Sequence, residues 1–143
     1  MSSEKSVGAI IFLRGKEIKY LLLHYESGHW DYVKGHIEKG ESEKETLLRE
    51  AKEEAGLTDL KIIDGFKERI RYFFKAEGKL ISKEVVFYLA ETKTEDIKLS
   101  FEHKGFKWLP YADAEKIVTY KNAKELLKKA DEFLKKKKSL RDF

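Results

Sequence analysis

Three glutamates, Glu50, Glu53 and Glu54, are spaced three and four residues apart, which places their carboxylates on one side of a helix within one turn. Carboxylate oxygens are ligands that Mg²⁺ and Mn²⁺ prefer, and such an ion can bridge the phosphates of a substrate. The same spacing also occurs on the solvated face of helices rich in Lys and Glu. Spacing alone therefore leaves both a metal site and an exposed acidic face open.

The helix expected to carry these glutamates covers residues 42–55. Ser42 followed by Glu45 forms a capping box, in which the serine oxygen accepts from an amide of the first turn and the glutamate reaches back. Gly56 suits the left-handed conformation that ends many helices. The three glutamates lie on a different side of the helix from its apolar stripe, so packing of the helix against the core does not require them. The apolar stripe expected to face the core consists of Leu47, Leu48, Ala51 and Ala55.

Other parts of the chain predict a sheet with helices on both sides. Residues 25–40 contain several glycines and are expected to form a loop with one short strand. The predicted class is therefore α/β (α+β), an α/β/α sandwich in which helices flank a mixed sheet. Strands are expected at residues 7–13, 19–24, 60–63, 70–74, 84–89 and 106–109, and two further helices at 112–118 and 123–134.

The length of 143 residues predicts a single domain over residues 1–143 with one substantial core. The chain has no Cys, which excludes disulfides and thiolate metal sites. No apolar run approaches the roughly 18 residues needed to span a bilayer, and the polar N-terminus does not resemble a signal peptide. We therefore expect a cytoplasmic protein without a membrane partner.

The net charge of +4 is concentrated at the C-terminus. Residues 121–143 contain nine Lys or Arg and four Asp or Glu, so this segment carries +5 and the rest of the chain −1. Its basic run, Lys135 to Lys138, is typical of a solvated helix face. A patch that attracts nucleic acid or polyphosphate is the alternative.

The segment around the three glutamates has a longer pattern. Residues 35–57 read GHIEKGESEKETLLREAKEEAGL and match G-x5-E-x7-R-E-U-x-E-E-x-G-U, the Nudix box, where U is aliphatic or small. On this motif the chain is identified as a member of the Nudix hydrolases, which implies their fold and a Mg²⁺ or Mn²⁺ cofactor. The nine matching positions are Gly35, Glu41, Arg49, Glu50, Ala51, Glu53, Glu54, Gly56 and Leu57.

The resemblance to the family implies a role for each charged residue of the box. Glu50, Glu53 and Glu54 match the metal ligands, and Glu53 or Glu54 is expected to act as base towards the attacking water. Glu41 and Arg49 match residues that brace the loop against the helix, and Arg49 is also expected to orient a metal-binding glutamate. These three residues, Arg49, Glu53 and Glu54, form the predicted catalytic set.

Segments outside the box resemble one group within the family, the asymmetrical diadenosine tetraphosphate hydrolases. The resemblance covers GAIIFLR, EIKYLLLH, GFKERIRYF, KEVVFYLAE and SFEHKGFKWL, in that order. It implies that Glu102 joins the metal ligands, with an exposed loop acid as the alternative. It also implies a substrate surface in which Lys34, His36, Lys83 and His29 meet phosphates, and Tyr72 and Tyr120 hold an adenine.

The function implied is hydrolysis of a phosphoanhydride bond, with diadenosine tetraphosphate (Ap4A) as the nucleotide substrate and ATP and AMP as products. An RNA 5′-pyrophosphohydrolase or a housecleaning nucleoside triphosphate pyrophosphatase, built on the same core, is the alternative. A nucleotide-binding module without turnover is a further alternative. Such a module would be expected to have lost carboxylates of the box, and here all of them are present. We expect a monomer or a weak homodimer.

Overall fold

A mixed seven-stranded sheet forms the centre of the computed structural model, which describes residues 2–141, with side chains for residues 3–137. Five strands follow the order β3-β2-β1-β6-β5, while β4 pairs with β1 and β7 pairs with β2. Strands β1 and β6 run parallel and their other neighbours antiparallel. The strands are β1 (Ser2–Arg14), β2 (Ile18–Tyr25), β3 (Trp30–Asp31), β4 (Val33–His36), β5 (Lys61–Ala76), β6 (Lys79–Glu91) and β7 (His103–Pro110).

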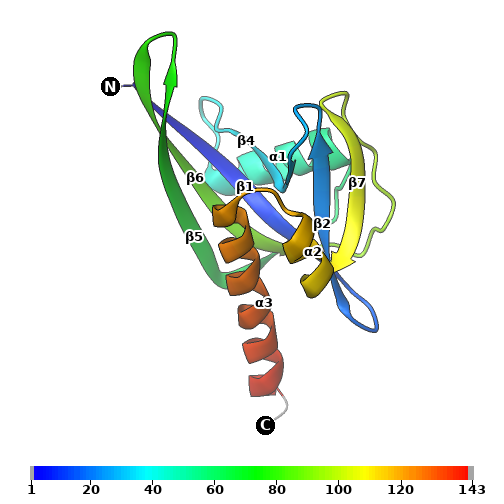
Figure 1. Ribbon diagram of the computed structural model, residues 1–143. Coiled ribbons are helices and arrows are strands. Elements are labelled where there is room, and N and C mark those ends of the chain that lie inside the picture. Colours follow the sequence, from blue (N-terminus) through cyan, green and yellow to red (C-terminus); the bar gives the residue numbers. More distant parts are fainter. Residues whose placement is uncertain (1, 142–143) are drawn as a thin grey trace.

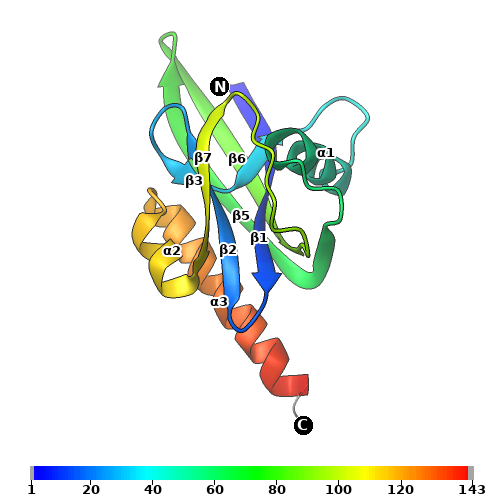
Figure 2. The ribbon, with the colours of Figure 1, turned by 90° about the vertical axis from the view of Figure 1, so that its right-hand side faces the viewer.

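The helices cover both faces of this sheet (Figure 2). Helix α1 (Glu43–Ala55) packs on one face against a cluster built around alternate residues of β1, such as Val7, Ala9 and Ile11. Helices α2 (Tyr111–Ile117) and α3 (Lys121–Arg141) pack on the other face, against Ile10 and Phe12 of the same strand. Alternation along β1 thus supplies both cores, and the predicted α/β/α arrangement is confirmed.

Two strand predictions were wrong. Residues 61–63 and 70–74 belong to one strand, β5, whose register on β6 shifts between Ile62 and Lys67, and Leu60 lies before it. Gly65 lies in the shifted segment with φ +95°. This irregularity interrupts the strand pattern between the two predicted segments. The loop expected at residues 25–40 contains two short strands, β3 and β4, because β1 and β2 offer them free edges.

The ends of α1 were predicted well and its buried face less so. Ser42 and Glu45 form the capping box, and Gly56 ends the helix with φ +70°. Leu48, expected in the core, is 45% exposed, whereas Glu54 is only 4% exposed. The backbone N–H of Ser100 donates to the carbonyl oxygen of Glu54 at 3.3 Å, so the segment before β7 covers this side of the helix.

Helix α3 extends past the sheet at its C-terminal end (Figure 1). Lys135 bonds to Asp131 at 2.8 Å, and the Lys137 ammonium lies 5.4 Å from the Phe133 ring centre, so part of the basic run contacts its own helix. The side chain of Lys138, predicted to belong to this run, and residues 142–143 lie outside the described residues. Over residues 2–141, no helix combines the length and the apolar character that a membrane span requires.

Candidate active site

Two cavities adjoin at strand β4, one between the sheet and the start of α3 and the other over α1. The first encloses about 710 Å³ and extends towards α3, and the second encloses about 670 Å³ over the Nudix-box helix. Tyr25 and Lys34 line both cavities, so the two adjoin at these residues. Every predicted site residue lines one of them: His29, Tyr72 and Tyr120 the first, Lys34 both, and His36, Arg49, Glu50, Glu53, Glu54, Lys83 and Glu102 the second.

Arg49 is the cation that pairs with Glu50 and Glu53 in this structure. Its Nη1 lies 2.7 Å from Glu50 Oε1 and 3.2 Å from Glu53 Oε2. Its Nε lies 2.7 Å from Glu41 Oε2, and its Nη2 donates to the carbonyl oxygen of His36 at 3.0 Å. The contacts to Glu41 and His36 hold the loop against the helix, as the resemblance implied.

The donor set suits a hard divalent cation, although in the conformation described its carboxylates are not gathered round one point. Within the described part of the chain, no three acidic or histidine side chains lie in a geometry that could hold a metal ion. Glu50 and Glu53 instead both accept hydrogen bonds from the Arg49 guanidinium. Two of the residues that would hold Mg²⁺ are thus in contact with the guanidinium in this structure.

Gly35 makes room for one of these carboxylates. A Cβ atom at this position would lie 2.1 Å from Cδ of Glu50, closer than any non-bonded contact allows. The glycine of the motif therefore leaves room for the side chain of a proposed ligand in the position that the structure gives it. It brings strand β4 directly against the acidic side of α1.

Glu54 is the buried member of the cluster. One carboxylate oxygen, Oε2, accepts from the backbone N–H of Lys34 at 3.1 Å, and Oε1 lies 3.5 Å from Nε2 of His103. Burial, together with the neighbouring charge of Glu50, raises the pKa of Glu54 to about 8. Such a carboxylate is far from a solvated surface charge, because desolvation without a bound cation disfavours its ionised form.

Apart from Arg49 on α1, the basic residues of the second cavity come from two strands, β4 and β6. Lys34 on β4 places its ammonium 3.1 Å from Asp31, which helps to raise its pKa although burial opposes this. His36, two residues on, has its Nδ1 3.4 Å from Ser6 on β1. Lys83 on β6 pairs in register with Tyr72 on β5, which brings a basic side chain and an aromatic one side by side. This arrangement suits a polyphosphate chain.

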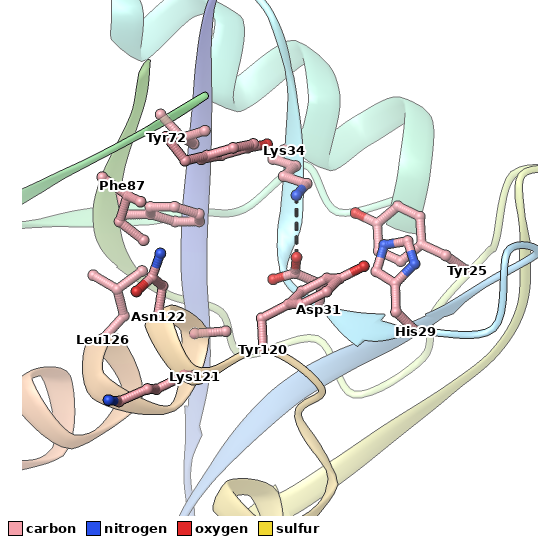
Figure 3. Close-up of a pocket in the computed structure, with 13 residues that line it drawn as sticks. Tyr25, His29, Asp31, Lys34, Tyr72, Phe87, Tyr120, Lys121, Asn122 and Leu126 are labelled. Atoms are coloured by element: carbon pink, nitrogen blue, oxygen red, sulfur yellow. Dashed lines mark hydrogen bonds and ion pairs between the residues drawn. The ribbon is translucent and has the colours of Figure 1, made fainter. Parts of the chain in front are cut away.

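The first cavity is mainly apolar and aromatic (Figure 3). Tyr72 and Tyr120 reach into it from opposite sides, one from β5 and the other from the residue before α3. Tyr72 is 36% exposed and Tyr120 51% exposed, so neither ring belongs to the packed core. His29 stacks on Tyr25, with ring centres 4.6 Å apart, and lies 5.4 Å from Tyr120. An aromatic base would find stacking partners here.

Several residues of the site were not predicted from the sequence. Tyr25 and Asp31 line the cavities within a segment that was expected to be mostly loop. His103 is buried directly behind Glu54, and burial lowers its pKa. Its place beside Glu102 in SFEH was the available signal, but a histidine that opens a strand resembles an ordinary core residue.

Comparisons with known proteins agree with this geometry. The NUDIX domain model matches residues 3–133, so the chain belongs to the Nudix hydrolase family. It is 36% identical to the asymmetrical bis(5′-nucleosyl)-tetraphosphatase of Sus scrofa, covering 91% of this chain and 95% of that one.

Two further relatives refine the comparison. A crystal structure of the C. elegans Ap4A hydrolase in a binary complex is similar at a TM-score of 0.81 and 36% identity, covering 92% of this chain and 97% of that one. An RNA pyrophosphohydrolase of Nitratiruptor sp. is 34% identical over a shorter stretch, 75% of this chain and 74% of its own. The similarity to the tetraphosphatases is therefore more extensive.

Proposed function

We propose that this protein hydrolyses dinucleoside polyphosphates, and that it cleaves P1,P4-bis(5′-adenosyl) tetraphosphate into ATP and AMP. The observation that carries the proposal is that an aromatic cavity and a charged cavity adjoin at Tyr25 and Lys34. The first cavity, which is aromatic, suits a nucleoside, and the second cavity, which is charged, suits the phosphate chain attached to that nucleoside. The activity named for the pig relative supports the same substrate class.

The carboxylates of Glu50, Glu53, Glu54 and Glu102 would hold the cation, and Mg²⁺ is the ion we propose, with Mn²⁺ as the substitute. When bound, such an ion neutralises phosphate charge and lowers the pKa of coordinated water. Glu53 or Glu54 accepts the proton of the attacking water. The new oxygen–phosphorus bond forms on one terminal nucleotide as the phosphoanhydride bond breaks, which releases AMP and ATP.

The remaining predicted residues bind or position. Lys34, Lys83 and His36 line the charged cavity and would contact phosphate oxygens. Arg49 holds the loop to the helix through Glu41 and pairs with Glu50 and Glu53, two of the residues that would hold the cation. We further propose that residues 1–143 act as one domain, in the cytoplasm, as a monomer or weak homodimer.

A substrate panel with Mg²⁺ tests the proposed function. We expect Ap4A to be cleaved faster than triphosphorylated RNA, nucleoside triphosphates or ADP-ribose, with ATP and AMP as products on chromatography. The control is the same panel with boiled protein. Preferential release of pyrophosphate from RNA would contradict the proposal and favour the RNA alternative, while binding of Ap4A without any turnover would favour the nucleotide-binding module.

The aromatic cavity gives a second prediction, for Tyr72→Ala. Loss of one stacking partner should raise KM for Ap4A by about five-fold or more, since base–aromatic stacking contributes roughly 1–3 kcal/mol per base. The melting temperature should change little, because the ring is partly exposed. The measurement is steady-state kinetics together with a thermal melt.

Phe73→Ala is the matched control for this variant. Phe73 is the next residue of β5, is 56% exposed and points to the opposite face, outside both cavities. We expect its KM for Ap4A to stay at the wild-type value. An unchanged KM in Tyr72→Ala, with a collapsed melting temperature, would show that Tyr72 packs the fold and binds no base.

A further inference from the structure

His103 has a buried nitrogen that lacks a hydrogen-bond partner. Its side chain is fully buried at the start of β7, and among the described side chains Nε2 is the buried polar atom that has no such bond. Buried polar atoms are nearly always paired, so an exception needs a reason. The group facing this nitrogen is the Glu54 carboxylate, whose Oε1 is 3.5 Å away, just beyond normal hydrogen-bond length.

The other ring nitrogen, Nδ1, has Ser100 as its hydrogen-bond partner. Ser100 Oγ lies 3.0 Å from Nδ1 of His103 and also accepts the backbone N–H of Glu102 at 3.3 Å. The serine oxygen accepts this one proton and can donate its own hydroxyl proton to Nδ1. A neutral imidazole that accepts at Nδ1 carries its proton on Nε2, the atom that faces Glu54.

The ring is also fixed in direction. Tyr25 packs edge-on against it, with ring centres 4.4 Å apart and planes inclined by 67°, and the Tyr25 hydroxyl donates to the Tyr32 carbonyl oxygen at 2.6 Å. On the far side of the carboxylate, Oε2 of Glu54 accepts from the backbone of Lys34. A bond from His103 would therefore complete a clamp on both oxygens of Glu54.

We infer that His103, with its tautomer set by Ser100, is a positioning residue that donates from Nε2 to Glu54 and ties the loop bearing Glu102 to α1. The inference rests on the metal site of the proposed function, because its consequence is a Glu54 held ready for the cation. A small closing of the loop, by about 0.5 Å, would bring 3.5 Å into bonding range. Partners that stand behind a metal ligand in this way commonly change metal affinity by about 10–100-fold when removed.

The test measures Mn²⁺ binding to the free protein by electron paramagnetic resonance, without substrate. We expect His103→Leu to weaken binding by about ten-fold or more. His103→Gln should recover most of the loss, because its amide N–H can reach the place of Nε2–H. Ser100→Ala should fall between wild type and His103→Leu, since it frees the tautomer and leaves the ring.

A histidine outside the site serves as the matched control. His24 stacks on Trp30 with ring centres 4.2 Å apart and lines neither cavity, so His24→Leu should bind Mn²⁺ like wild type. A thermal melt in metal-free buffer accompanies each variant. If His103→Leu melts earlier but binds Mn²⁺ as tightly as wild type, or if His103→Gln binds as weakly as His103→Leu, the positioning role is refuted.

A metal-independent measurement separates this inference from the proposed function. Nitrogen-15 chemical shifts of the His103 ring should report the Nε2–H tautomer in wild type and a mixture of tautomers in Ser100→Ala. Protonation on Nδ1 in wild type would overturn the inference even if the protein hydrolyses Ap4A. Conversely, the Nε2–H tautomer in a protein that binds no Mn²⁺ would leave the clamp standing and refute the proposed metal site.

Discussion

Removal of divalent cations should abolish hydrolysis of Ap4A, and added Mg²⁺ should restore it. The phosphate chain is anionic, and the charged cavity presents Glu50, Glu53, Glu54 and Glu102 to it. Without a cation these carboxylates repel the substrate, and no coordinated water of lowered pKa is available to attack. Activity in protein treated with EDTA should therefore fall below detection by chromatography of the products.

The loss should come from the chemistry and leave the fold intact. Arg49 already compensates Glu50 and Glu53 in the structure, so the metal-free protein should keep a cooperative melt. Readdition of Mg²⁺ or Mn²⁺ should then return the activity at once, without refolding. Full turnover in chelator-treated buffer would refute the metal-dependent mechanism.

The parts of the site that could be predicted are those coded locally. The capping box and the glycine that ends α1 depend on residues within one turn of each end, so the helix was located to within a residue. The motif also placed Glu50, Glu53 and Glu54 on this helix, and all three line the second cavity. The likeness to the tetraphosphatases added residues that lie far apart in sequence, such as Lys83 and Tyr120, and both line the site.

The parts that could not be predicted depend on distant contacts. Glu54 is buried and Leu48 is exposed because the segment at Ser100 covers one side of α1 and leaves the other to solvent. The short strands β3 and β4 exist because β2 and β1 offer edges to them, which no local pattern shows. The position of His103 behind Glu54 likewise requires β7 to be placed beside β2.

Glu53→Gln and Glu54→Gln should each lower kcat for Ap4A by at least about 100-fold, the lower range for loss of a general base. The measurement is kcat across the full substrate panel at saturating Mg²⁺. Glu132→Gln, an exposed acid on α3, is the matched control and should keep wild-type kcat. Near-normal kcat in both site variants on every substrate would make these glutamates ordinary surface charges, and the enzyme assignment would be lost with them.

The two variants should differ in stability, because Glu54 is buried while the Glu53 side chain is 58% exposed. The folded-state pKa of Glu54 is raised to about 8, by burial first and then by Glu50 and Glu102, with the N–H of Lys34 opposing. Between its ordinary pKa of 4.5 and about 8 the folded protein therefore binds more protons than the unfolded chain, so metal-free wild type loses stability as pH rises through that window.

Glu54→Gln removes the ionisation that causes this loss. In metal-free buffer it should melt above wild type by about 2–4 °C or more at pH 8, the shift that about 1 kcal/mol produces in a domain of this size. The difference should shrink towards pH 4.5, the ordinary pKa of the group, while Glu53→Gln should stay close to wild type at both values. Mg²⁺ should then raise the melting temperature of wild type more than that of either variant, since a ligand that binds only the folded state stabilises it. A Glu54→Gln protein that melts below wild type at pH 8 would show that this carboxylate holds the fold together and carries no strain that a cation relieves.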